Sequence, residues 1–299
     1  MRALLILSTL ALALPPLGGP AAVAAADGDP RPEILRLLNV ERQRAGAPPL
    51  RLSPPLARAA QEHAAEVSAR GDLKLRAGST EEMRERLKRL GYQVHAWTEN
   101  LATNDGGPAE VLRDWRAQDP ETWRKLLSPE YRDLGIGLGR IGRTPLYTFL
   151  YAVPAGEWFA AETAGLRDLG RIQADMLARV NAERRKAGVP ALKPNPKLDV
   201  AAQRHAEDML ARAYFAHESP EGKTVRERTR AAGYDWRSIG ENIAEGQFSV
   251  AEVMETWMNS PGHRRNILDK GFKELGVGLA LGRSGDGYQV EWVQTFGTR

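Results

Sequence analysis

Residues 181–206 read NAERRKAGVPALKPNPKLDVAAQRHA, and residues 39–64 read NVERQRAGAPPLRLSPPLARAAQEHA. The two stretches align without a gap, and more than half of their positions are identical. The same spacing of 142 residues then pairs Glu99 with Glu241. A register that holds over most of each copy indicates a duplicated domain rather than a short-period repeat. We therefore expect two copies of one fold, and differences between the copies carry information about function.

The order of predicted elements within a copy indicates the fold class. In the second copy, apolar residues recur at helical spacing in residues 172–180 and again in 198–209. Apolar runs of strand length follow at 275–281 and 288–296, and a turn rich in glycine separates them. Helices followed by a pair of antiparallel strands are typical of an α+β fold rather than a parallel α/β fold.

The N-terminal residues 1–26 have the pattern of a signal peptide. A basic start at Arg2 precedes an apolar run, and small residues stand before Asp27. The apolar run is too short to span a membrane comfortably. The chain has no cysteine, which excludes disulfides and thiolate zinc sites. We expect a secreted protein, extracellular or periplasmic, with no transmembrane span after removal of the signal.

The charge pattern bears on the class of partner. The formal net charge is +4, and basic and acidic residues alternate in segments such as Arg226-Glu227-Arg228. Alternating signs are typical of a solvated helix face, so we expect no nucleic acid partner. A basic exported protein suits a partner in the cell envelope, namely a cell-wall polymer, a lipid or a protein.

Three of the five histidines have structural interpretations. His63 and His205 occupy equivalent positions in the two copies, each on the apolar stripe of a predicted helix. This position favours a buried histidine with a satisfied hydrogen bond. His95 is expected in a loop, and Arg237 stands at its place in the second copy.

His217 and His263 have no counterparts in the first copy. Leu75 occupies the position of His217, and Thr122 stands roughly at that of His263. His263 falls in the first turn of a predicted short helix, where the helix dipole disfavours a charged ring. A neutral imidazole there is available as a ligand or a base.

The motifs of the second copy resemble those of a known family, the CAP superfamily of cysteine-rich secretory proteins, antigen 5 and plant pathogenesis-related proteins. The motifs are Phe215-Ala216-His217, Gly240-Glu241-Asn242-Ile243-Ala244, Trp257, Ser260-Pro261-Gly262-His263, Gly276-Val277-Gly278 and Val293-Gln294-Thr295-Phe296. The resemblance is to the cysteine-free bacterial branch. It implies two tandem α-β-α sandwich domains, each with a small antiparallel sheet between helices.

The resemblance also divides the chain. It implies a degenerate CAP-like domain at residues 31–155, a linker at 156–168 and a CAP domain at 169–299, all after the signal peptide at 1–26. The match is good over about 169–297 and weak over about 32–155.

In many members of this family, two histidines and two acidic residues line an open cleft and hold a divalent metal. Here His217 and His263 match the histidines, Glu241 matches the first acid, and Ser260 stands where the second acid is expected. The resemblance therefore implies a ligand-binding cleft of His217, Glu241, Ser260 and His263, with His217 and His263 as ligands of a metal such as zinc. The glutamate survives as Glu99 in the degenerate copy, which favours a structural alternative in which it accepts backbone N–H bonds.

Three functions stay open at this stage. We favour a non-catalytic binding module, which is not an enzyme. The alternative is a metal-dependent hydrolase, such as a protease, in which Glu241 is the catalytic base. The chain lacks a His-Glu-x-x-His motif and a nucleophile elbow, and Ser260 before Pro261 is expected to cap a helix rather than attack a substrate. A third possibility is sterol or lipid binding.

Overall fold

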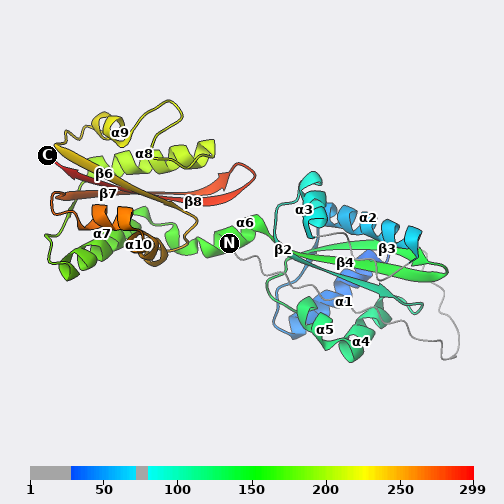
Figure 1. The fold of residues 1–299 in the computed structure, drawn as a ribbon. Helices are drawn as coiled ribbons and strands as arrows, with labels where there is room; N and C mark the ends of the chain where they lie inside the picture. Colours follow the sequence, from blue (N-terminus) through cyan, green and yellow to red (C-terminus); the bar gives the residue numbers. More distant parts are fainter. Residues whose placement is uncertain (1–27, 72–79) are drawn as a thin grey trace. The chain divides into compact units, whose positions relative to one another are not determined.

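The computed structural model describes residues 28–71 and 80–299, and the predicted signal peptide lies outside these ranges. The chain divides into two compact units, one ending at Trp158 and the other beginning at Phe159 (Figure 1). Each unit has one four-stranded sheet with helices on both faces, which confirms the predicted α+β architecture. No helix within the described ranges is both long and apolar enough to cross a membrane.

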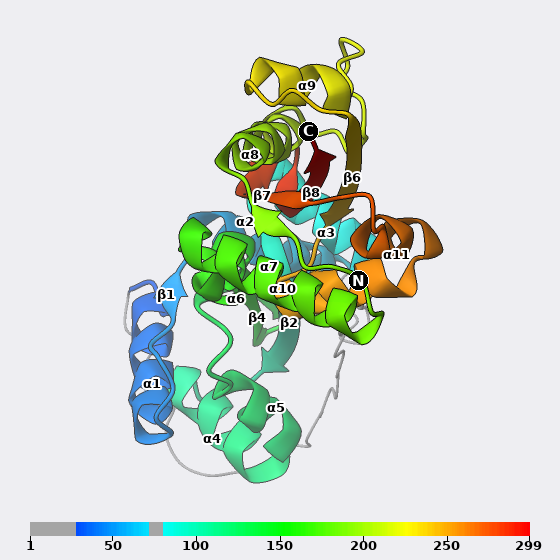
Figure 2. The same cartoon turned by 90° about the vertical axis from the view of Figure 1, so that its left-hand side faces the viewer.

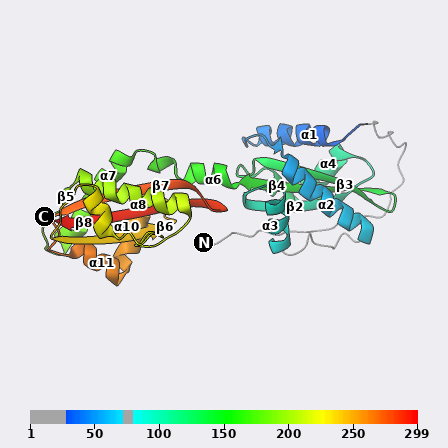
Figure 3. The same ribbon diagram turned by 90° about the horizontal axis from the view of Figure 1, so that it is seen from above.

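The first unit has a sheet of strand order β1-β3-β4-β2, in which the short β1 pairs parallel with β3 and the other pairs are antiparallel. Helices α2 and α3 lie over one face, and α1, α4 and α5 lie over the other (Figure 1). Seen from above, α2 crosses the strands (Figure 3). Its elements are α1 (Arg31–Arg44), β1 (Arg51–Leu52), α2 (Pro54–Arg70), α3 (Thr80–Arg89), β2 (Val94–Thr103), α4 (Pro108–Gln118), α5 (Pro120–Leu126), β3 (Asp133–Ile141) and β4 (Thr144–Pro154).

The second unit repeats this arrangement with the strand order β5-β7-β8-β6. Helices α8 and α9 cover one face of its sheet, and α7, α10 and α11 lie on the other (Figure 2). Its elements are α7 (Leu169–Lys186), β5 (Lys193–Pro194), α8 (Pro196–Arg212), α9 (Val225–Ala231), β6 (Ser238–Glu245), α10 (Val250–Asn259), α11 (Pro261–Leu268), β7 (Glu274–Ser284) and β8 (Gly287–Thr298).

Helix α8 lies directly on strand β7 because two glycines present no side chain to it. A Cβ atom on Gly276 would stand 2.1 Å from the backbone carbon of Leu198, and one on Gly278 would meet the next turn of the helix backbone at 2.3 Å. The first unit uses Gly135 and Gly137 in the same way under α2. This close approach sets the distance between α8, which carries His205, and the sheet, which carries Glu241.

One buried arginine in each unit fastens loops to the first helix. Arg184 and Arg42 have no exposed surface. Arg184 donates hydrogen bonds to the carbonyl oxygens of Pro190, Ile267, Asp269 and Phe272. Arg42 donates to those of Pro48, Leu126 and Tyr131. Guanidinium groups satisfy buried carbonyls here because they carry five donors in a fixed geometry.

The expectation that His95 lies in a loop is wrong. His95 is part of β2, and its ring stacks on Trp158 with the centroids 3.8 Å apart. The pairing of β2 with β4 shifts register between Val94 and Ala96. Such a bulge interrupts the alternation of side chains by which a strand is recognised in a sequence.

The segment predicted as a linker is ordered in the structure. Residues 156–168 contain most of helix α6 (Ala155–Glu162) and a short turn of 3-10 helix, η1 (Ala164–Leu166). Phe159 is buried, and its ring packs against Phe248 and Tyr288 of the second unit. Through these aromatic contacts the segment packs against the second unit.

Candidate functional site

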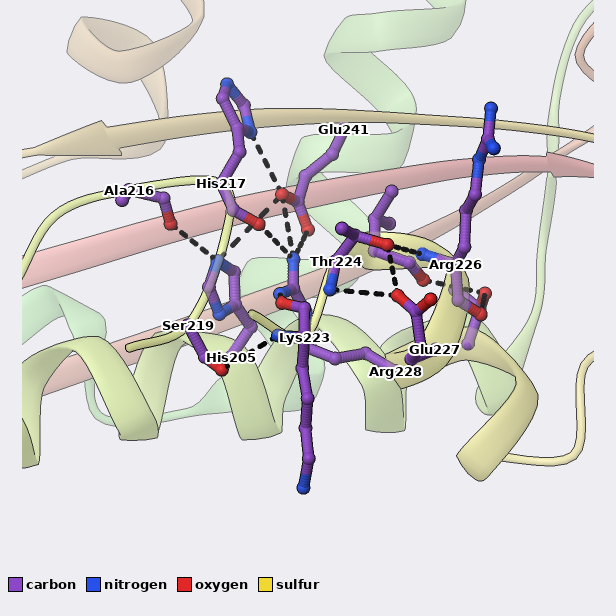
Figure 4. Close-up of polar contacts among 12 residues, drawn as sticks. His205, Ala216, His217, Ser219, Lys223, Thr224, Arg226, Glu227, Arg228 and Glu241 are labelled. Atoms are coloured by element: carbon purple, nitrogen blue, oxygen red, sulfur yellow. Dashed lines mark hydrogen bonds and ion pairs between the residues drawn. The ribbon is translucent and has the colours of Figure 1, made fainter. Parts of the chain in front are cut away.

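Glu241 on β6 is the centre of a polar cluster in the second unit (Figure 4). Its side chain is only 3% exposed. Arg228 donates from Nη2 to both carboxylate oxygens, at 3.0 and 2.8 Å, and His217 Nδ1 lies 3.0 Å from Oε1. A buried carboxylate requires such a partner, because an unpaired charge in the protein interior is costly. We call His205, His217, Arg228, Glu241 and His263 the Glu241 cluster.

Arg228 also fastens the loop that carries His217. It donates to the carbonyl oxygens of His217 and Lys223, at 3.0 and 2.7 Å (Figure 4). Its own helix, α9, begins with a capping box formed by Thr224 and Glu227. Arg228 is therefore held on a well-capped helix. Its hydrogen bond to the backbone carbonyl of His217 fixes that residue, while the side chain of His217 stays 59% exposed.

His205 supports the cluster from beneath. It is fully buried on α8, and its Nε2 lies 3.0 Å from the carbonyl oxygen of Ala216 and 3.9 Å from Glu241 Oε1. Burial lowers the pKa of His205, and the charge of Glu241 opposes that effect. A neutral ring that donates to Ala216 anchors the residue next to His217.

His263 lies in the first turn of α11, as predicted. Burial lowers its pKa, and the charge of His217 lowers it further. The Nδ1 atom of His263 is buried and has no hydrogen-bond partner. The ring is therefore neutral at neutral pH and has an unsatisfied nitrogen.

A ladder of side-chain amides holds the backbone around His263. Asn266 donates to the side chain of Asn242 at 2.9 Å and to the carbonyl oxygen of Glu241 at 3.1 Å. Asn242 in turn donates to Gln294 at 3.1 Å and to the carbonyl oxygen of His263 at 3.2 Å. The ladder binds α11 to β6, so the histidine of one element keeps its place beside the glutamate of the other.

Ser260 does not join the cluster in the way the sequence suggests. It occupies the N-cap position of α11, but its side chain makes no capping hydrogen bond. In the first unit Asp119 has the equivalent place, and it does accept a bond from the backbone nitrogen of Thr122, at 3.0 Å. The predicted capping bond of Ser260 is therefore absent, although its position is as expected.

The first unit holds its glutamate differently. Glu99 accepts from the fully buried His63, with 2.7 Å between Nδ1 and Oε1. Arg86, which corresponds to Arg228, binds Glu66 at 2.6 Å instead. Leu75 lies outside the described residues. Among the described residues, the carboxylates of Glu99 and Glu241 both accept from side chains, and the predicted acceptance of backbone N–H bonds stays a prediction.

Two residues of the cluster were missed from the sequence as functional candidates. Arg228 was visible only as part of an alternating charge pattern, and His205 was interpreted as a core residue. The signal that could have found Arg228 is its retention as Arg86 in the first copy. An arginine that is kept in both copies is a candidate partner for a glutamate that is also kept, although the neighbouring Arg226 is retained as Arg84 in the same way.

The cluster does not fit the metal site that the resemblance implies. Within the described part of the chain, no group of three or more His, Asp or Glu side chains is placed to hold a metal. The carboxylate of Glu241 is already occupied by Arg228, which leaves the imidazoles of His217 and His263 as donors. The pockets described in this structure, of about 740 and 310 Å³, are lined by other residues.

Comparison with protein families gives a match in both units. The model of the CAP family, described as the cysteine-rich secretory protein family, matches residues 35–151 and 177–296, which together make up more than half of the chain.

Two relatives come from Bacillus subtilis (strain 168). The protein YkwD, described as uncharacterized, is 41% identical over 116 residues, which are 39% of this chain and 43% of that protein. YlbC, described as an uncharacterized membrane protein, is 33% identical over 104 residues, which are 35% of this chain and 30% of that protein. The chain thus matches less than half of the length of either relative.

Solved structures also resemble the chain. An extracellular protein with an SCP domain from Bacillus anthracis is 22% identical with a TM-score of 0.39, over 52% of each chain. An outer surface protein from Borrelia burgdorferi is 21% identical with a TM-score of 0.37, over 42% of this chain and 91% of that one.

Proposed function

Because the chain belongs to the cysteine-rich secretory protein (CAP) family, we propose that it is a secreted or envelope-associated binding protein rather than an enzyme. The second domain binds the ligand through His217 and His263, and the buried Glu241 holds His217 in place. The observation that carries the proposal is the engagement of Glu241, whose two carboxylate oxygens both accept from Arg228.

This engagement argues against the hydrolase alternative. A general base must reach the proton it removes and have a lone pair free to take it. Glu241 is buried, is paired with a guanidinium and is in contact with His217. Activating a water molecule would require Arg228 to move away, which would leave a buried charge unpaired.

The exposed part of the cluster suits a polar partner. His217 is largely exposed, and the guanidinium of Arg228 lies directly behind it. The chain has a net charge of +4, which favours association with anionic polymers or headgroups of an envelope. In the first domain the glutamate, Glu99, is bound by the buried His63. Because that domain lacks the two exposed or neutral histidines of the second, we assign it the role of a spacer or a second docking surface.

Co-sedimentation with isolated cell-wall sacculi tests the proposal. The full chain is expected to sediment with the sacculi, and a His217→Ala, His263→Ala double variant is expected to stay in the supernatant. A matched control is His95→Ala, which alters a histidine of the first domain. Failure to bind sacculi, anionic vesicles or other envelope fractions would contradict the binding role.

A metal held by His217 and His263 stays the alternative prediction for the same cluster. Two neutral imidazoles are suitable zinc donors, but they leave the remaining coordination positions to water or to a ligand. Calorimetric titration of zinc into the metal-free chain distinguishes the two ideas. We expect no saturable binding; one-to-one binding that the double variant abolishes would instead establish the metal site and reopen the hydrolase hypothesis.

A further inference from the structure

A second polar site lies away from the Glu241 cluster, near the turn between β7 and β8. It is a pocket of about 310 Å³ in the second domain. The residues that characterise it are Tyr214 and Phe215 after α8, Glu245 on β6, and Tyr288 and Glu291 on β8. None of these belongs to the Glu241 cluster, so the pocket requires its own explanation.

Glu291 is the unusual residue of this pocket. It is only 2% exposed, and its Oε2 atom is buried without a hydrogen-bond partner. Glu245 stands directly opposite it on the neighbouring strand. Burial, with a smaller contribution from Glu245, raises the pKa of Glu291 to about 7. The pocket therefore holds a buried carboxyl group with an unsatisfied oxygen beside a second carboxylate, Glu245, which accepts from Gln289 Nε2 at 2.8 Å.

The first domain shows that the fold does not need a carboxyl group there. Glu99 pairs with Leu150 as Glu241 pairs with Thr295, which aligns the two sheets. Four residues further along β2, Thr103 pairs with Leu146, and four residues further along β6, Glu245 pairs with Glu291. Leu146 therefore has the position of Glu291. Leu146 is 1% exposed and packs in an apolar cluster with Ala64 and Val67. Leucine packs at this position without a polar group, so packing of the core does not explain why the second domain has a carboxyl group there.

The walls of the pocket indicate the class of ligand. Tyr214, Tyr288 and Phe215 supply aromatic surface, and Phe215 is 42% exposed. Aromatic faces attract organic cations, and carboxylates bind them by charge. Two carboxyl groups are fewer oxygen ligands than a bare Ca²⁺ ion takes, and among the described residues no third acid lines the pocket. An alkylammonium group satisfies both features, because its charge meets the acids while its carbon chain meets the rings.

We infer that the pocket of Glu245, Glu291, Tyr214, Phe215 and Tyr288 binds a primary ammonium group carried on an alkyl chain. Such a group is the chemistry of an amine-bearing side chain of a polymer or peptide. The site is separate from the proposed envelope-binding cluster and does not depend on it.

Titration of butylammonium chloride into the full chain by calorimetry at pH 8 tests the inference. We expect saturable one-to-one binding that is lost in Glu291→Leu, which introduces the side chain that Leu146 has in the first domain. Glu291→Gln, which keeps the shape, is expected to lose most of the affinity. Butan-1-ol, which has the same chain without charge, is expected not to bind, and the His217→Ala, His263→Ala variant is expected to bind as the unaltered chain does.

The pH dependence supplies a second readout. The titratable groups around Glu291 are Glu245 on β6, Tyr288 on its own strand, and Tyr214, which donates to Asp208 of α8. Arg212 of α8 is already paired with Glu221. Since Glu291 must lose its proton to bind the cation, affinity is expected to be about tenfold weaker at pH 6 than at pH 8. Equal binding of butan-1-ol, binding that survives Glu291→Leu, or Ca²⁺ binding in place of butylammonium would overturn the inference.

Discussion

Arg228→Met is the most informative single substitution in the Glu241 cluster. Methionine keeps an unbranched side chain of similar reach but removes the guanidinium that binds Glu241. The pair is deeply buried, with side chains 11% and 3% exposed. Removal of one partner from a buried ion pair costs about 3–5 kcal/mol, because the other charge is left uncompensated. For a domain of this size that loss corresponds to a fall of roughly 10–20 °C in Tm.

The first domain provides the matched control. Arg86 has the equivalent place, but its partners Glu62 and Glu66 are 38% and 43% exposed. Exposed pairs contribute about 0–1 kcal/mol, so Arg86→Met is expected to change Tm by only a few degrees. Differential scanning calorimetry of both variants measures the two domains in one chain. The addition of Glu241→Gln to Arg228→Met is expected to restore part of the loss. Equal effects of the two arginine substitutions would refute the assignment of Glu241 as a buried, guanidinium-bound carboxylate.

Three further outcomes are expected. Gly278→Ala places a Cβ 2.3 Å from the backbone of Ala202 and should destabilise the second domain by about 1–3 kcal/mol, whereas Gly165→Ala, which meets nothing within 4 Å, should not; denaturant unfolding measures both. Arg184→Met leaves several buried carbonyl oxygens unpaired and should cost roughly 2–4 kcal/mol in the same assay, against less than about 0.5 kcal/mol for the exposed Arg179→Met; equal losses would contradict the anchoring role. The pKa of Glu291 is raised from 4.5 to about 7, so the folded state binds the proton more tightly and the domain should lose roughly 3 kcal/mol of stability as the pH rises from about 4.5 to about 7. Glu291→Gln should remove that part of the pH dependence, and an unchanged profile in this variant would show that the carboxyl group is not protonated in the fold.

The architecture was predictable because the chain contains two copies of the same sequence pattern. Periodic apolar residues located α7 and α8, whereas the close contact of Gly276 and Gly278 with α8 was seen only in the structure. The hairpin was also located, although its strands extend further than the apolar runs and leave a turn of only Gly285 and Asp286. The polar residues next to the turn pair across the hairpin through their backbones. They are not hydrophobic, so the sequence pattern did not show that the strands extend to them.

Three of the five residues of the Glu241 cluster were predicted from the sequence, but the bonds between them were not. His217, Glu241 and His263 come from a loop, a strand and a helix, and no spacing rule brings Arg228 onto Glu241. The direction of a long arginine side chain depends on which carboxylate is buried and unpaired. In the first domain His63 takes that place at Glu99, and Arg86 turns to other acids. The acids that bind Arg86 also differ between the copies, since Arg204 stands at the position of Glu62 and Asp208 at that of Glu66.

The amide ladder beneath His263 has a consequence for how such a site can change. His263 is fastened through Asn242 and Asn266 of β6 and α11, whereas His217 is fastened through Arg228 of α9. The two rings thus rest on separate supports, which meet only at Glu241. A substitution in one support is therefore expected to shift one histidine while the other stays in place.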